Sequence, residues 1–267
     1  MKRRPAVAGQ FYHDTAQRLT QQIERYTDQD ASKEDAVGIV VPHAGLVYSG
    51  PVAGAVYSSI KFPMTFVMLG PNHTGLGARI SLMEDSEWEI PTCTFNVDRK
   101  LAGKIALNVP KVERDSQAHV FEHSLEVQLP FIAYFSNKVK IVPIVLLSVS
   151  LDDCFELAEG IAKAVKSVDY PVTIIASSDM SHYQPDEITR QKDKKAIEKI
   201  LDLDPEGLFE IVRRERISMC GYLPVTVMLA AAKLLGAGSA RLVKYSTSGD
   251  VSGDYDSVVG YVGIVIR

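Results

Sequence analysis

Short, continuous apolar runs that end at turn residues constrain the fold of this chain more than any other feature of its sequence. Four such runs, rich in β-branched residues, are 37–41, 66–69, 141–147 and 172–176. Apolar runs of this length are typical of strands that are buried on both faces of a sheet. Because segments with helical spacing separate them, the order predicts an α/β fold, a single three-layer domain with a mainly parallel central sheet.

The remaining elements complete this prediction. Helical spacing predicts helices over residues 14–26, 51–60, 122–135, 152–165, 189–201 and 221–235. Near the end of the sequence, 242–245 and 258–266 are strand-like and are joined by the turn-rich residues 248–254, so we expect an antiparallel pair there. No linker rich in Pro, Gly or Ser interrupts the sequence, and we expect one domain over residues 1–267.

Composition excludes several classes of function. With 46% hydrophobic and 23% charged residues, the chain has the composition of an ordinary globular protein. Its net charge of −4, with no basic run longer than residues 2–4, offers little to nucleic acid or to an anionic membrane. No apolar run is long enough to span a bilayer. The three cysteines are too few for a disulfide framework, and no signal-like apolar stretch follows Met1, so we expect a cytoplasmic protein.

Three histidines follow directly on predicted buried strands, and their position makes them candidates for a functional site. These are His43, His73 and His182. In open α/β sheets, ligands bind beyond the carboxyl ends of the strands, where side chains from distant parts of the sequence converge. Two neutral imidazoles at one point form a metal site that lacks one or two ligands. The candidates for a third ligand are Asp179, Glu122 and Cys220.

Cys220 differs from the other two cysteines in its surroundings. It lies just before a predicted helix, whose amides and dipole should lower the pKa of the thiol. Cys93 lies in a β-like segment, and Cys154 lies in the first turn of a predicted helix beside two aspartates, whose charge opposes thiolate formation. We therefore favour Cys220 as the reactive cysteine and expect Cys93 and Cys154 to be inert.

A competing motif joins His119, Glu122 and His123, which match the H-x-x-E-H spacing of inverted zinc peptidases. On one helix the two histidines would share a face and bind zinc, and Glu122 would act as the base. However, residues 124–130 indicate that the helix begins near Glu122, which leaves His119 in the preceding loop.

Motifs distributed in order along nearly the whole chain resemble those of the Memo family, whose prokaryotic members are called protein B of the AmmeMemoRadiSam system. The motifs are Arg4–Tyr12, Val41–Gly45, Tyr48–Ala53, Leu69–Gly75, Glu122–Phe131, Ser177–Tyr183, Cys220–Gly221 and Thr247–Asp250. The resemblance implies a single α/β domain related in fold to the class III extradiol dioxygenases, which hold non-haem iron with two histidines and a carboxylate.

The same resemblance assigns roles to residues of this sequence. It implies that His43 and His73 are metal ligands and that Cys220 stands where the dioxygenases have their carboxylate. His182 matches the acid–base histidine, with Asp179 beside it, and Glu122 and His123 are further pocket residues. The expected metal ligands are thus His43, His73 and Cys220. The expected catalytic residues are His182, Asp179 and His123, and the H-x-x-E-H match becomes accidental.

The thiol distinguishes this site from that of the dioxygenases. A thiolate favours Cu(I), zinc or thiolate-ligated iron over metals that prefer hard oxygen ligands. We expect a metal-binding protein with iron or copper, or alternatively zinc, that performs O₂-linked redox chemistry on an unknown small molecule. Two other hypotheses are a peptide- or protein-binding adaptor with a vestigial metal site and a zinc-dependent hydrolase. The family name further suggests a radical-SAM enzyme and an AmmE-like protein as partners.

Overall fold

The four apolar runs form the centre of a nine-stranded sheet in the computed structural model, which describes residues 2–267. Strands β2 (Gly38–Val41), β9 (Val172–Ser177), β3 (Thr65–Pro71) and β8 (Lys140–Leu146) lie side by side in that order, and each neighbouring pair is parallel. Nearly all their residues are buried, as expected for strands covered on both faces.

Antiparallel strands flank this parallel centre, so the sheet is mixed rather than mainly parallel. Strand β12 (Val258–Ile266) pairs antiparallel with β2, with β10 (His182–Gln184) and with β11 (Ala240–Thr247). At the other side, β4 (Ile80–Leu82) is antiparallel to β8 and carries the parallel strand β7 (Glu113–Arg114). The expected antiparallel pair near residue 250 is confirmed as β11 and β12, joined by a turn that contains helix α10 (Gly249–Ser252).

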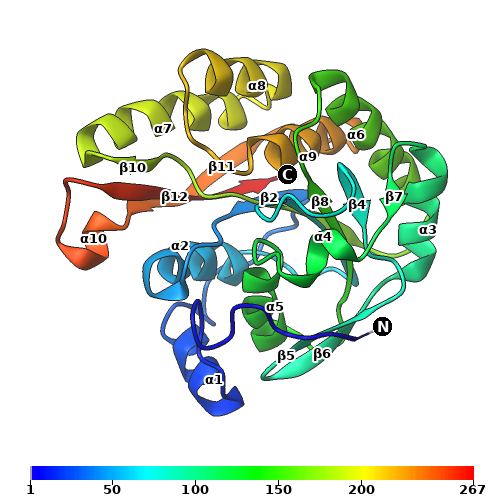
Figure 1. Cartoon of the computed structure of the whole chain (residues 1–267), viewed down its shortest axis with the longest axis horizontal. Coiled ribbons are helices and arrows are strands. Elements are labelled where there is room, and N and C mark those ends of the chain that lie inside the picture. Colours follow the sequence, from blue (N-terminus) through cyan, green and yellow to red (C-terminus); the bar gives the residue numbers. More distant parts are fainter. Residues whose placement is uncertain (1) are drawn as a thin grey trace.

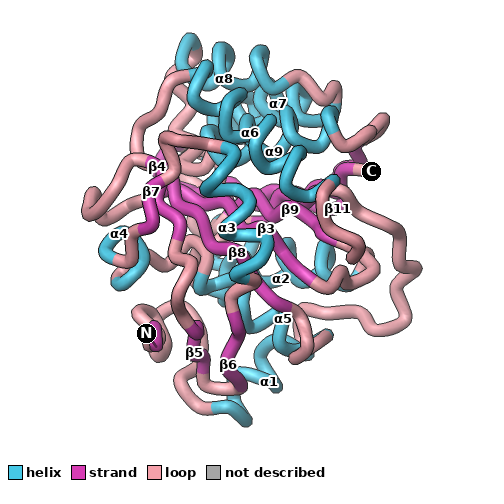
Figure 2. Tube along the Cα trace, turned by 90° about the vertical axis from the view of Figure 1, so that its right-hand side faces the viewer, coloured by secondary structure: helices cyan, strands magenta, loops and turns pink. Residues whose placement is uncertain are grey.

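Helices cover both faces of the sheet and make the three layers visible in Figures 1 and 2. One face is covered by α3 (Arg99–Asn108), α6 (Leu151–Lys166), α7 (Asp186–Leu201), α8 (Pro205–Arg214) and α9 (Tyr222–Leu234). The opposite face carries α2 (Leu46–Ser58), on which α5 (Leu129–Phe135) and then α1 (Ala16–Glu24) pack.

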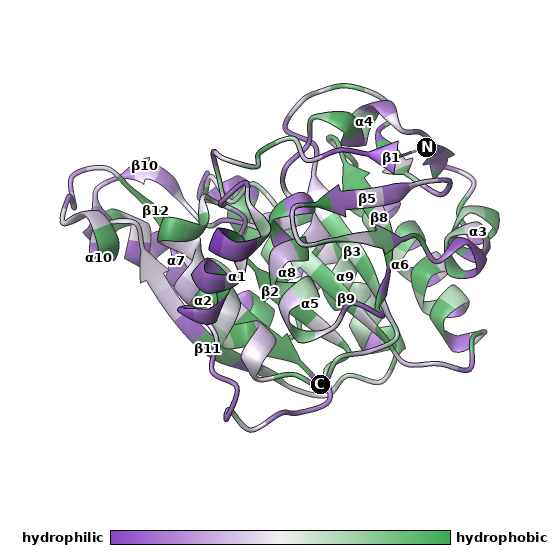
Figure 3. Ribbon diagram, turned by 90° about the horizontal axis from the view of Figure 1, so that it is seen from below, coloured by the Kyte–Doolittle hydropathy of each residue, from purple (hydrophilic) through white to green (hydrophobic). Residues whose placement is uncertain are grey.

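A small second sheet lies beside these layers. It consists of β1 (Lys2–Arg3), β5 (Glu87–Ile90) and β6 (Cys93–Asn96). Hydrophobic residues are concentrated in the central strands, which are largely green in the ribbon of Figure 3. One continuous core cluster joins residues from Val7 to Ile266, which supports the expected single domain.

The segment between β7 and α5 departs from the expected helix over residues 122–135. A short helix, α4 (Gln117–Val120), is followed by a loop, the 3₁₀ turn η1 (Glu126–Gln128) and then α5. Pro130 lies at the first turn of α5, where a missing N–H leaves no hydrogen bond unmade. Polar contacts within the loop, described below, replace the helical hydrogen bonds that the spacing had predicted.

An ion pair between Arg3 and Glu126 ties the first strand of the chain to this loop. Both side chains are buried, and Arg3 Nη1 lies 2.5 Å from Glu126 Oε2. The Arg3 guanidinium also donates to the carbonyl oxygens of His119, at 2.9 Å, and Glu122, at 2.6 Å. Glu126 accepts further hydrogen bonds from the Tyr12 hydroxyl and from the backbone N–H groups of residues 6 and 7. The N-terminal segment therefore holds residues 119–126, from the end of α4 to the start of η1, in place.

Within residues 2–267, no helix combines the length and the apolar character that crossing a membrane requires.

Replacement of Arg3 by methionine is expected to lower the free energy of unfolding by about 3–5 kcal/mol, because it leaves the buried Glu126 carboxylate without its cation. Lys2→Met is the matched control, since Lys2 pairs with Glu89 at the surface and such pairs contribute about 0–1 kcal/mol. Urea unfolding followed by circular dichroism measures both. Equal losses in the two variants would contradict the anchoring role of Arg3.

Candidate metal centre

The loops that follow β2 and β3 leave the same edge of the sheet and bring two of the predicted histidines together. The register pairs Val41 with Ser177 and Leu69 with Ala176, so the three strands end at one level. The rings of His43 and His73 consequently lie with their centroids 5.3 Å apart. The sequence-based expectation that strand ends would gather these two histidines agrees with the structure.

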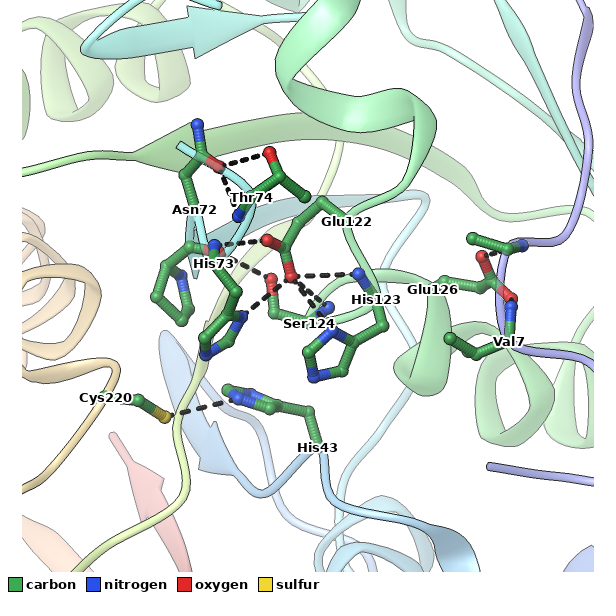
Figure 4. Close-up of polar contacts among 12 residues, drawn as sticks. Val7, His43, Asn72, His73, Thr74, Glu122, His123, Ser124, Glu126 and Cys220 are labelled. Carbon is green, nitrogen blue, oxygen red and sulfur yellow. Dashed lines mark hydrogen bonds and ion pairs between the residues drawn. The ribbon is translucent and has the colours of Figure 1, made fainter. Parts of the chain in front are cut away.

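A third histidine, His123, joins them from the loop that precedes η1. Its ring stacks on His73, with centroids 4.7 Å apart, and lies edge-on to His43 at 5.5 Å. One ligand nitrogen from each of the three histidines lies within 4.8 Å of the other two. Figure 4 shows the three rings turned towards one another. Among the described residues this is a group whose donor atoms could hold a metal ion.

Glu122 supports the ring of His73 and organises the loop around it. Its buried carboxylate lies 2.9 Å from His73 Nδ1 and accepts a further hydrogen bond from the backbone N–H of His73. It also accepts from the backbone N–H groups of His123, at 2.9 Å, and Ser124, at 2.8 Å. A carboxylate that accepts a hydrogen bond from the Nδ1–H of a histidine fixes the ring and presents Nε2 to a metal.

The balance of contacts keeps Glu122 ionised despite its burial. Burial raises the pKa of this carboxyl, but the hydrogen bond and electrostatic interaction with His73 and the N–H of Ser124 outweigh it and lower the pKa to about 2. Glu122 is therefore an anion at neutral pH. It supplies negative charge directly behind a candidate ligand.

The other two imidazoles are held uncharged. Burial lowers the pKa of His43 far below its usual value, and His123 and His73 lower it further. Burial likewise lowers the pKa of His123, although Glu122 opposes the effect. Neutral imidazoles offer lone pairs to a metal, so these two rings are in the protonation state that a metal site needs.

Cys220, the predicted third ligand, lies beside the Nε2 atom of His43. Its Sγ is 3.3 Å from His43 Nε2 and 3.3 Å from the backbone nitrogen of Asp179. The sulfur thus contacts one histidine of the cluster, as Figure 4 shows. The group of donor atoms that lie within 4.8 Å of one another consists of His43, His73 and His123. The role of Cys220 as a ligand stays a prediction.

The expected lowering of the Cys220 pKa is wrong for the metal-free protein. Burial raises the pKa of the thiol strongly, and the nearby Asp179 carboxylate raises it further. Hydrogen bonds with the Asp179 backbone, the Ser178 side chain and the Gly221 backbone act in the opposite direction but are outweighed. Without a cation beside it, the thiol keeps its proton.

Cys93 and Cys154 agree with the expectation that they are inert. Both are free thiols. Burial raises the pKa of Cys154 to about 12, with a contribution from Asp153, and burial also raises the pKa of Cys93. Neither contacts the histidine cluster in the described interactions.

Asp179 and His182, two of the predicted catalytic residues, border the cluster. Asp179 Oδ1 accepts from the backbone N–H of His43 at 2.8 Å, and its Oδ2 lies 4.0 Å from His43 Nε2. Burial raises the pKa of Asp179, while the His43 N–H and His182 lower it. His182 lies in β10, with its Nδ1 2.8 Å from the carbonyl oxygen of Ser218. The carbonyl only accepts, so Nδ1 is the donor in this hydrogen bond.

The H-x-x-E-H spacing does not form the site of a zinc peptidase. His119 lies on α4, is fully buried, and places its Nε2 3.2 Å from the carbonyl oxygen of Ser81 and its ring against Trp88. His123 belongs to the following loop, so the two histidines share no helix face. The sequence-based expectation that the two histidines share no helix agrees with this arrangement, but the expected place of His119 in a loop is wrong, because it lies on α4.

From the sequence His123 was expected as a catalytic residue of the pocket, and its place in the group that could hold a metal ion was not expected. It follows no strand, so the reasoning from strand ends did not reach it. The available signal was its place next to Glu122, because a carboxylate that supports one imidazole also draws its neighbour into the same site.

Gly221 allows Cys220 to approach the cluster. A Cβ at position 221 would collide with the Ser177 carbonyl oxygen and would lie 2.6 Å from Ser178 Cβ. The start of α9 can therefore meet the end of β9 only if this residue lacks a side chain. The Gly221 N–H donates to Ser178 Oγ at 3.0 Å and secures this contact.

We expect Gly221→Ala to lower the free energy of unfolding by about 1–3 kcal/mol, because the added methyl forces apart two buried segments. Gly238→Ala is the control, since nothing lies within 4 Å of a Cβ there, and its stability should stay within about 0.5 kcal/mol of wild type. Urea unfolding of both variants provides the comparison. A Gly221→Ala protein as stable as the Gly238→Ala protein would show that the close approach is unimportant.

Comparisons with known proteins agree with the resemblance found in the sequence. The family described as Memo-like protein matches residues 3–265. A MEMO1 family protein of Pyrobaculum aerophilum is 46% identical over 275 residues, covering 98% of each chain. Relatives in Saccharolobus solfataricus, 42% identical over 98% of each chain, and Methanopyrus kandleri, 40% identical over 100% of this chain and 99% of its own, carry the same family name. The chain therefore belongs to the Memo family.

Proposed function

We propose that this protein binds a transition metal ion at the cluster formed by His43, His73 and His123, with Cys220 beside it. The observation that carries the proposal is the convergence of three histidine side chains from separate loops on one point. Two of these imidazoles are held neutral by burial, and the third is backed by an ionised carboxylate. Histidines that bind metals almost always donate their other ring N–H to a carboxylate, a carbonyl or water, as His73 does to Glu122.

The donor set narrows the choice of metal. Imidazole nitrogens suit iron, copper and zinc, and a thiolate from Cys220 would favour copper, zinc or thiolate-ligated iron. We propose His43 and His73 as ligands in every case, with Cys220 as the third ligand in keeping with the family resemblance. His123 is the alternative third ligand, since its nitrogen is grouped with the other two. We propose iron or copper as the resident metal, with zinc as the alternative.

A bound iron or copper ion would supply O₂-linked redox chemistry on a small molecule, in keeping with the proposed relation of this fold to the class III extradiol dioxygenases. The protein's own groups would move protons. His182, whose Nδ1 donates to the carbonyl oxygen of Ser218, is the group we propose for proton transfer with a substrate, through its Nε2. Asp179 holds the His43 backbone and adds negative charge beside the cluster.

A binding role is the second candidate. Exposed apolar side chains adjoin site residues in the sequence, among them Tyr48, Leu76, Phe121 and Tyr183. Such side chains suit contact with another molecule. We propose a radical-SAM enzyme and an AmmE-like protein as candidate partners, on the strength of the family name. A cytoplasmic location is proposed because all three cysteines are free thiols.

Titration with Co(II) under anaerobic conditions tests the ligand set. We expect one Co(II) ion per chain, and loss of affinity by more than about 100-fold in His43→Ala and in His73→Ala, since loss of a supporting residue alone costs about 10–100-fold. Cys220→Ser should abolish the near-ultraviolet thiolate-to-cobalt band if Cys220 is a ligand. His13→Ala, which removes an exposed histidine, is the control. Wild-type protein that binds no Co(II), iron, copper or zinc would refute the proposed function.

Elemental analysis of anaerobically purified protein, combined with oxygen uptake by the isolated protein, distinguishes the candidate activities. We expect bound iron or copper and O₂ consumption that depends on that metal and falls in His182→Gln. Bound zinc with ester or amide cleavage in the absence of O₂ would favour a hydrolase instead. Bound metal with no turnover of either kind would favour the binding role.

A further inference from the structure

A buried chain of hydrogen bonds leads away from the metal centre behind His43. The Nδ1 atom of His43 lies 2.9 Å from the hydroxyl oxygen of Ser177, the last residue of β9. Both residues are almost completely buried. The hydroxyl is the group that His43 Nδ1 meets, so its hydrogen bonds decide which ring nitrogen of His43 carries the proton.

The Ser177 hydroxyl has one proton, and its neighbours dictate where that proton points. Its oxygen lies 2.7 Å from the carbonyl oxygen of Ser124, which can only accept, so the hydroxyl donates there. The two lone pairs of the hydroxyl oxygen then remain for donors. One of them receives a hydrogen bond from Gln128 Nε2 at 2.9 Å.

The orientation of the Gln128 amide is itself determined. Its Nε2 also lies 2.8 Å from the carbonyl oxygen of Pro42, and a carbonyl can face only the donor end of an amide. Its Oε1 accepts from the hydroxyl of Tyr57 at 3.0 Å. Burial raises the pKa of Tyr57 well above its usual value, so the phenol stays protonated and donates. The amide group therefore donates to Ser177 and cannot accept from it.

The Ser177 hydroxyl donates its proton in a hydrogen bond to the Ser124 carbonyl and accepts one hydrogen bond from Gln128. It can therefore only accept a further hydrogen bond, and His43 Nδ1 must be the donor. We propose that Ser177 and Gln128 are positioning residues that hold the proton of His43 on Nδ1 and thereby present Nε2 to the metal centre. For its effect on metal binding this inference rests on the proposed function. The protonation site of His43 itself is a property of the metal-free protein.

The opposite tautomer would leave buried groups unpaired. A lone pair on His43 Nδ1 would face the lone pair of the Ser177 oxygen unless the hydroxyl turned away from Ser124. The Ser124 carbonyl would then lose its donor, and an unpaired buried polar group costs more than a typical hydrogen bond contributes. A proton on Nε2 would also point at the cluster and at Cys220 Sγ, 3.3 Å away, and would block that nitrogen as a ligand.

Nitrogen-15 NMR of the full-length, metal-free protein tests the proposal directly. The ring nitrogen shifts of His43, assigned by comparison with His43→Ala, should show a protonated Nδ1 and an unprotonated Nε2. In Ser177→Ala the preference should weaken or reverse, and the affinity for Co(II) should fall about 10–100-fold. Ser49→Ala is the matched control, because the Ser49 hydroxyl is also fully buried but donates to the Ala44 carbonyl.

The outcomes separate this inference from the proposed function. A proton on Nε2 in the wild-type spectrum overturns the inference, and this measurement stands even if Ser177→Ala does not fold. An unchanged tautomer in a folded Ser177→Ala protein overturns it as well. A proton on Nδ1 that is lost in Ser177→Ala and kept in Ser49→Ala supports the inference. A wild-type protein that shows this behaviour but binds no metal refutes the proposed function alone.

Discussion

The arrangement of the candidate metal centre depends on one buried carboxylate. Glu122 accepts hydrogen bonds from the ring and backbone of His73 and from the backbone of His123 and Ser124. These contacts join the loop after β3 to the loop before η1. No helix or strand pairing links these two loops. Because burial of a charge is unfavourable without such donors, the carboxylate and the two loops stabilise each other only when all are in place.

The support extends from the centre to the beginning of the chain. Arg3 donates to the carbonyl oxygen of Glu122 and pairs with Glu126, so residues 2–12 hold the loop from its outer side while His73 meets it from the inner side. On the opposite side of the cluster, Ser177 and Gln128 stand behind His43. The ring nitrogens of His73 and His43 thus form hydrogen bonds with the buried side chains of Glu122 and Ser177, respectively. Such contacts fix the orientation of the rings, which a precise metal geometry requires.

Cys220 is in a different state from the histidines. Its buried thiol is protonated beside His43 and Asp179, whereas a sulfur ligand must be a thiolate. Binding of a cation next to it would favour loss of that proton, so metal uptake through Cys220 would release a proton. A centre bound by His43, His73 and His123 alone has no thiol proton to lose. The count of released protons therefore reports which third ligand is used.

The sequence by itself determined the parallel centre of the sheet and the convergence of His43 and His73, because buried strands and their ends are local patterns of residues. The Memo family membership was also readable from ordered motifs. Only the tertiary structure decided that β12 and β4 pair antiparallel with the parallel centre, that the 122–135 segment is not one helix, that the Cys220 pKa is raised and that the His123 ring lies close enough to His43 and His73 to share a metal ion with them. Each of these depends on contacts between residues far apart in the chain, since burial and hydrogen bonding across loops override the preferences of local sequence.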